Sequence, residues 1–265
     1  MENTRAKTTR NSLILLLTAT IWGMAFVSQS KGMDYMHPFT FNGVRSLIGA
    51  AGILVYILIS RKIAGDKAVK LDWKLNVKAG LLCGIFLTIA STLQQFGIKY
   101  TSVGKAGFIT TLYIIFVPMF GIFLKKKVAP VVWAAAGMAA VGMYLLCMTE
   151  SLRLGAGDIM VFLCAIAFAI QIMTVDHYAA RIDGAVVSCI QFTVCGVVCC
   201  IGALIWGQPT FGQIQEGLGA LLYAGVLSCG VGYTLQIVGQ KGLNPTVAAL
   251  IMSLESVIAT ISGWI

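Results

Sequence analysis

Charged residues are scarce in this chain. They make up 11% of its 265 residues, and the mean hydropathy is +0.88, whereas about a quarter of the residues of a soluble domain are charged. A soluble core has no room for so much apolar sequence, so the composition excludes an ordinary water-soluble protein and indicates that lipid is the second solvent. The net charge of +9 does not indicate nucleic-acid binding, because the basic residues form short clusters between apolar runs, as at a membrane surface.

Histidine is scarcer still, and the sequence has no phosphate-binding motif. The two histidines are His37, in a connection, and His177, near a helix end, and neither belongs to a His-Glu-x-x-His pattern. This inventory argues against a membrane-embedded enzyme, which needs a nucleophile and a base, or metal ligands, at lipid depth. Because the sequence also lacks a P-loop, we do not expect this chain to use ATP hydrolysis as an energy source. We therefore predict no enzyme activity, no metal and no cofactor.

Cysteine is not scarce, but all eight cysteines lie inside apolar runs. This placement favours a packing role. Cys195 and Cys199 share a helix face, yet no histidine stands near them to suggest a metal site. The cysteines indicate neither a disulfide framework nor a redox compartment.

Nine apolar runs dominate the sequence. Each holds about 19 to 25 residues, the length that crosses about 30 Å of hydrocarbon, and in lipid such segments must be helices. A basic leader (Arg5, Lys7, Arg10) precedes the first run, and because eight more runs follow, we predict a signal-anchor helix instead of a cleaved signal peptide. The predicted helices cover residues 12–30, 38–60, 77–98, 102–124, 130–148, 157–178, 185–206, 217–238 and 244–265.

The sequence contains an internal duplication. Eight identities recur at an offset of 142 residues, among them Gln94 with Gln236 and the glycine and lysine that follow each glutamine. Such a constant offset predicts two copies of one structural unit. The copies differ at Pro118, which lies inside the fourth run and is expected to kink it, because its repeat mate is Thr260.

The distribution of lysine and arginine predicts the orientation. If the N-terminus is cytoplasmic and the runs alternate, 14 of the 19 basic residues lie on the cytoplasmic side and four on the far side, with Arg45 inside a helix. This bias predicts a multi-pass protein of the cell membrane with a cytoplasmic N-terminus.

The repeat and the orientation together predict the architecture. Five helices per copy is an odd number, so the first unit (residues 1–149) and the second (residues 150–265) are expected to cross the membrane in opposite directions. We predict an all-α polytopic membrane helix bundle of two inverted five-helix repeats, in which nine helices are present and the tenth is missing. Inverted repeats are typical of secondary transporters, because two similar halves can exchange conformations around a shared site.

Short motifs in both halves resemble the EamA-type permeases of the drug/metabolite transporter superfamily. The resemblance covers the whole chain, with one departure at Lys125-Lys126-Lys127, where relatives carry a Gly-Glu-Arg-like turn. It implies a secondary transporter, exporter or importer, of a small metabolite such as an amino acid or drug-like compound, working by alternating access around a midplane cavity. The matching residues are Trp22-Gly23, Arg45, Gly97 through Thr101 with Ala106, Asn244-Pro245, Ala248-Ala249-Leu250 and Ser253-Leu254-Glu255.

Charges inside the lipid-spanning runs are the first candidates for function, because a charge at mid-bilayer costs about 2.5–3.5 kcal/mol. Glu255 lies roughly 16 Å into the last run, near the midplane. It either faces the central cavity, where it binds a cation or a proton, or forms a structural pair with Arg45, whose expected depth is similar. Lys105, just inside the fourth run, is expected to extend to the membrane surface.

Amides and aromatic residues complete the predicted substrate site. Gln94 and Gln236 are repeat mates, and Gln171 adds a third amide; interhelical hydrogen bonding is the alternative role for all three. The aromatic candidates are Trp22, Tyr113, which aligns with Glu255 at the repeat offset, and Tyr233. Packing is the alternative for each of them.

The expected partners are a small-molecule substrate and the lipid bilayer, with no nucleic acid; a homodimer stays open. Two other functions are weighed against transport. One is a non-transporting membrane sensor or assembly subunit, which would show no substrate flux in sealed vesicles. The other is the intramembrane enzyme, against which the histidine inventory argues.

Overall fold

A computed structural model describes residues 2–65, 71–124 and 155–264, together with scattered residues between 130 and 142. Within these residues every regular element is a helix, which confirms the prediction of an all-α polytopic bundle. Eight helices are long and apolar enough to span a membrane, and they coincide with eight of the nine predicted runs. The fifth predicted run, residues 130–148, lies mostly outside the described residues.

The first half contains five described helices. They are α1 (Glu2–Tyr35), α2 (Pro38–Ala64), α3 (Trp73–Ile98), α4 (Val103–Thr110) and α5 (Tyr113–Phe123). The helix α1 begins well before the predicted start of its apolar run, because the basic leader continues the same helix. Polar side chains fix the beginnings of later helices: the Asp72 carboxylate accepts the Leu75 N–H at 3.0 Å, and the Ser102 hydroxyl accepts the Lys105 N–H at 3.3 Å.

The second half is described from Gly155 onward. Its long helices are interrupted by two π-helical segments, η2 and η3, which place one extra residue in each turn. The elements are α7 (Ala156–Tyr178), α8 (Gly184–Gly202), η2 (Ala203–Gly207), α9 (Phe211–Glu216), α10 (Leu218–Leu222), η3 (Tyr223–Gly232), α11 (Tyr233–Gln240), α12 (Pro245–Met252) and α13 (Glu255–Trp264).

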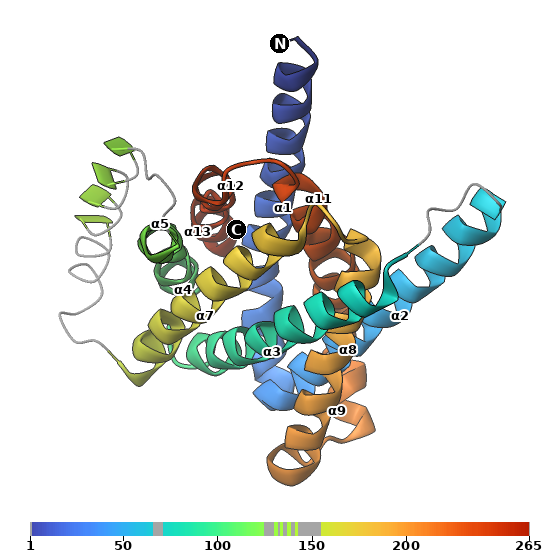
Figure 1. The fold of residues 1–265 in the computed structure, drawn as a ribbon. Coiled ribbons are helices and arrows are strands. Elements are labelled where there is room, and N and C mark those ends of the chain that lie inside the picture. The colour runs from blue at the N-terminus through green and yellow to red at the C-terminus, as the bar shows by residue number, and fades with distance from the viewer. Residues whose placement is uncertain are drawn as a thin grey trace.

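Helices from the two halves interlock (Figure 1). The helix α2 packs against α8, α3 packs against α7 and α8, and α1 packs against α13. At one α3–α7 contact the two backbones touch: a Cβ on Gly97 would lie 2.8 Å from the Gly157 carbonyl oxygen, and a Cβ on Gly157 would lie 2.8 Å from that of Gly97. Glycine at both positions therefore permits this close approach.

The fourth and ninth predicted runs are each broken into two helices. The chain turns at Thr111–Leu112 between α4 and α5, and at Ser253–Leu254 between α12 and α13, positions that are 142 residues apart. At both turns a backbone hydrogen bond spans three residues instead of four. It runs from the Leu112 N–H to the Ile109 oxygen in the first half and from the Leu254 N–H to the Ile251 oxygen in the second. The break precedes Pro118 and recurs in a copy that lacks this proline, so proline is not its cause.

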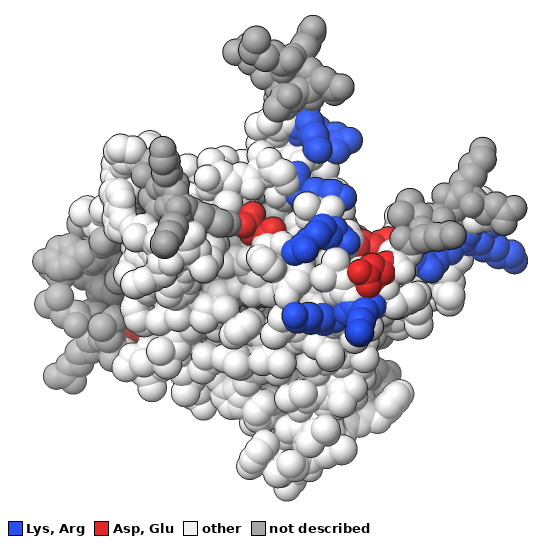
Figure 2. Space-filling model, viewed as in Figure 1, with Lys and Arg blue, Asp and Glu red and all other residues white. Residues whose placement is uncertain are grey.

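The surface of the bundle is suited to lipid. Leucine, isoleucine and phenylalanine side chains are exposed along the outer faces of the spans, for example Leu54 (48%), Ile85 (50%) and Ile201 (54%). Figure 2 shows lysine and arginine gathered toward the end of the molecule where the N-terminus lies, while the lower part of the visible face is white. This arrangement fits a bilayer around the white region.

His37 caps the beginning of α2, outside the membrane spans. Its Nδ1 atom accepts the Phe39 N–H at 3.4 Å, and its ring lies 5.5 Å from that of Phe96. Burial lowers the pKa of His37 below 6.5, and the nearby Lys99 ammonium lowers it further. The neutral imidazole is therefore the form that the fold favours.

This cap predicts a pH dependence of stability. Because the folded-state pKa of His37 is depressed, its contribution is complete above about pH 6.5 and is lost as the pH falls through the folded-state value. We expect the Tm of the purified protein to fall between about pH 7 and pH 5, and to fall less in His37→Asn, whose side chain caps the helix without titrating. Equal pH profiles for the two proteins would contradict this role.

Candidate functional site

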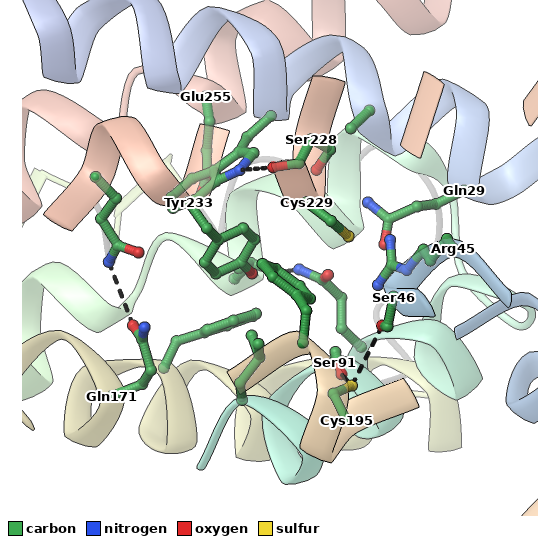
Figure 3. Close-up of a pocket in the computed structure, with 18 of the residues that line it drawn as sticks. Gln29, Arg45, Ser46, Ser91, Gln171, Cys195, Ser228, Cys229, Tyr233 and Glu255 are labelled. Carbon is green, nitrogen blue, oxygen red and sulfur yellow. Dashed lines mark hydrogen bonds between the residues drawn. The ribbon is translucent and has the colours of Figure 1, made fainter. Parts of the chain in front are cut away.

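A buried cavity lies at the centre of the bundle, where both halves meet (Figure 3). Its volume is about 40 Å³, which is room for a few water molecules. Both halves line it, through α1–α5 on one side and α7, α8, η3, α11 and α13 on the other. The cavity is therefore closed to a metabolite in this conformation, because ligand pockets usually measure about 300–1,000 Å³.

All eight residues predicted for the substrate site and its gating charge line this one cavity. Their side chains come from seven helices that are distant in the sequence, and all of them are buried except Trp22, which is partly exposed. Their role in substrate binding stays a prediction. The residues are Trp22, Arg45, Gln94, Tyr113, Gln171, Tyr233, Gln236 and Glu255.

A carboxylate marks one side of the cavity. Glu255 is 3% exposed and accepts the Tyr113 hydroxyl proton at 3.0 Å. These two residues are repeat mates, and each is the first residue after a helix break. Two positions that the predicted duplication makes equivalent are therefore in contact. Broken helices that begin at a buried site are a recurrent way to present backbone dipoles to a substrate.

A guanidinium marks another part of the cavity wall. Arg45 is 5% exposed, lies 5.4 Å from the centroid of the Phe41 ring, and has no hydrogen-bond partner for Nε within the described part of the chain. Figure 3 shows Arg45 well apart from Glu255. Among the described residues neither side chain forms an ion pair with the other. The structure therefore does not show the alternative, a structural pair between Arg45 and Glu255.

Aromatic rings separate the two charges. The ring of Tyr233 lies 4.5 Å from that of Trp22 and 5.0 Å from that of Phe192, measured between centroids. The Trp22 Nε1–H donates to the Ser228 carbonyl oxygen of η3 at 3.4 Å. The π-helical turn thus supplies a backbone acceptor that fixes one wall of the cavity.

Amide side chains form a hydrogen-bonded series along the wall. Gln236 donates to Gln171 at 3.2 Å, Gln171 donates to Gln191 at 3.5 Å, and Gln94 donates to Thr110 at 3.2 Å. The oxygens of Gln236 and of Gln29, which also lines the cavity, are buried and have no partner among the described residues. Since buried polar atoms are normally satisfied, these atoms indicate a cavity that receives water or a polar ligand.

The sequence did not single out several other lining residues. Gln29 follows Trp22 by seven positions and was recoverable from helical spacing. Cys195 lies 3.5 Å from the Ser46 hydroxyl and 3.4 Å from that of Ser91. This small polar cluster beside Arg45 had no sequence signal, because serine and cysteine are common packing residues in membrane helices.

Lys105 does not extend to the membrane surface as expected. It is 6% exposed, and its ammonium lies 2.7 Å from a carboxylate oxygen of Asp158, which is 4% exposed. Asp158 also accepts the Thr101 hydroxyl at 2.7 Å and the Gly155 N–H at 2.9 Å. These contacts join α4 to α7, one helix from each half, outside the cavity lining.

Comparisons with known proteins agree with this architecture. The EamA-like transporter family matches residues 10–148 and 155–265. An uncharacterized transporter of Archaeoglobus fulgidus is 30% identical over 62% of this chain, and the match spans about half of the archaeal protein (48%). Uncharacterized transporters of Clostridium kluyveri and Bacillus subtilis (YwfM) are 24% and 26% identical over 94% and 95% of this chain, and the matches cover 83% and 84% of their own lengths.

The fold is also found in a crystal structure. That structure superimposes with a TM-score of 0.74, covering 96% of this chain and 86% of the other, at 16% sequence identity. At this identity the likeness concerns the fold alone. The family match over both halves shows that the chain belongs to the EamA-like transporter family, and eight helices long and apolar enough to span a membrane agree with a multi-pass membrane transporter.

Proposed function

We propose that this protein is a secondary transporter of a small zwitterionic metabolite, such as an amino acid, at the cell membrane. The observation that carries the proposal is the separation of charges in one cavity. Arg45 and Glu255 both line it, yet they do not neutralise each other. A zwitterion is the ligand class that satisfies both groups at once.

Each charge suits one end of such a ligand. A guanidinium binds a carboxylate through parallel hydrogen bonds, and the Arg45 Nε atom is available for one of them. The Glu255 carboxylate suits an ammonium group, and the neighbouring rings of Trp22 and Tyr233 add cation–π attraction. A buried charge without its counterpart is costly, so a ligand that lacks either group is expected to bind poorly.

Alternating access is the proposed mechanism. The units at residues 1–149 and 150–265 are taken to be inverted, with the N-terminus cytoplasmic, so that two conformations open the cavity to opposite sides. The cavity of about 40 Å³ corresponds to an occluded conformation, and substrate entry then requires the halves to move apart. The paired breaks at 111–112 and 253–254 are suited to this movement, because each divides a span beside the cavity.

The test is substrate binding and flux with the purified full-length protein. We expect zwitterionic amino acids to raise the Tm and to enter proteoliposomes, while their methyl esters, which lack the carboxylate, do neither. Arg45→Gln is expected to lose this discrimination, since removing one partner of a buried charge pair costs 2–5 kcal/mol, at least about thirtyfold in Kd.

Two outcomes contradict the proposal. If an amino acid and its methyl ester gave equal Tm shifts and equal flux, the ligand would not be recognised as a zwitterion. Binding without flux in sealed vesicles would favour the sensor function over transport.

A further inference from the structure

Two adjoining cavities lie on the outer surface of the bundle, the first between α2 and the η3–α11 segment. An apolar groove of about 420 Å³ runs there. Its walls are open to the membrane: Tyr56 is 61% exposed and Val226 is 45% exposed. Gly52 forms part of the groove, and a Cβ placed on it would have no atom within 4 Å. The groove therefore has apolar walls and free space beside Gly52.

The apolar groove continues into a polar pocket at the end of α2. This pocket has a volume of about 520 Å³ and shares Tyr56, Thr234 and Val238 with the groove. Three basic side chains line it, Arg61, Arg181 and Lys241. Two adjoining cavities, one apolar and one basic, thus form a single amphipathic surface.

The two carboxylates of the pocket do not neutralise these cations. Asp72 caps α3 by accepting the Leu75 N–H, and Asp183 caps α8 by accepting the N–H groups of Ala185 and Val186. In the described part of the chain, no carboxylate lies within ion-pair distance of Arg61, Arg181 or Lys241. With three basic and two acidic side chains in its lining, the pocket keeps an excess of positive charge.

The pocket is lined by residues at the ends of candidate spans, where lipid headgroups are expected. The Arg61 guanidinium lies 5.6 Å from the centroid of the Trp73 ring, and tryptophan is enriched at the membrane interface. The Asn11 amide donates to the Lys241 carbonyl oxygen at 2.8 Å, which ties the pocket to the same end of the molecule as the N-terminus. Figure 2 shows that basic side chains gather at this end.

We propose that this surface binds one anionic phospholipid, with its phosphate in the basic pocket and an acyl chain along the apolar groove. The match rests on charge complementarity and on the continuity of the two cavities. Basic pockets between membrane helices are suited to anionic headgroups. Because the groove joins α2 to η3 and α11, a bound lipid contacts both halves of the transporter.

The test is native mass spectrometry and thermal shift of the purified full-length chain with phosphatidylglycerol, phosphatidylcholine or soluble glycerol phosphate. We expect phosphatidylglycerol alone to remain bound and to raise the Tm. Removing two charges in the Arg181→Gln/Lys241→Gln variant is expected to weaken binding about 25-fold, since each basic residue near an anionic lipid contributes a factor of about five. Gly52→Leu, which fills the groove, is expected to abolish binding.

Matched controls come from a groove elsewhere on the surface, lined by Met24, Lys31 and Gly219 among others. Lys31 is exposed, and a Cβ on Gly219 would also have no atom within 4 Å. Lys31→Gln and Gly219→Leu are therefore expected to leave binding unchanged. Equal binding of phosphatidylcholine, equal loss in the controls, or a thermal shift from glycerol phosphate as large as that from the lipid would overturn the proposal.

Discussion

Replacing Asp158 with asparagine is expected to lower the free energy of unfolding by about 3 kcal/mol, because it removes the buried carboxylate charge that the Lys105 ammonium contacts at 2.7 Å. Asparagine has nearly the same shape, but its single oxygen can replace only one of the two carboxylate oxygens, which accept from Thr101 and from Gly155. The loss therefore reports the charge together with one hydrogen bond, and not the packing. Reversible unfolding of the purified protein in mixed micelles measures it.

Two further variants test whether the loss of stability comes from the buried charge or from any Asp-to-Asn change. Asp34→Asn makes the same change at an exposed carboxylate and is expected to alter stability by less than about 0.5 kcal/mol. Lys105→Met combined with Asp158→Asn removes both charges and is expected to recover more than half of the loss, because an apolar replacement of a buried pair is often tolerated. A double variant as unstable as Asp158→Asn alone would show that the ion pair is not the source.

Glu255→Gln is expected to reduce substrate flux by at least about thirtyfold, since it removes the charge proposed to bind the ammonium group. If substrate movement is coupled to protons, the same variant is expected to abolish substrate-linked proton movement. Glutamine keeps an oxygen that can accept from the Tyr113 hydroxyl, so the local structure is preserved. Flux into proteoliposomes with a pH-sensitive dye inside measures both quantities.

The control is Glu216→Gln, an identical change at an exposed carboxylate of α9, for which flux is expected to be unchanged. Unaltered flux of Glu255→Gln at every pH would remove Glu255 from substrate binding and from coupling. A loss of flux accompanied by a lower Tm would instead assign Glu255 a structural role.

The sequence predicted the spans and the cavity residues because both follow from one rule. A polar side chain in a long apolar run must face the protein, so Gln94, Gln171 and Glu255 were recoverable without any structure. The predicted duplication aligns Tyr113 with Glu255 at the offset of 142, and these two side chains are in contact in the structure.

The sequence did not predict the Lys105–Asp158 ion pair or the two helix breaks. Lys105 was expected to reach the surface, because a lysine near a helix end usually does so. Its partner Asp158 is 53 residues away in another helix, and the pairing depends on how α4 packs against α7. The helix breaks were likewise not predicted, since Thr111–Leu112 and Ser253–Leu254 contain neither glycine nor proline.

The broken spans decide which side chains meet at the centre of the bundle. The helices α4 and α12 have eight residues each and extend about 12 Å, less than half of the hydrocarbon thickness. The helices that follow them begin at Tyr113 and Glu255, and the backbone ladder continues across both breaks through i→i−3 bonds. Moving either break by one residue would turn its side chain by about 100° around the helix axis, away from its partner.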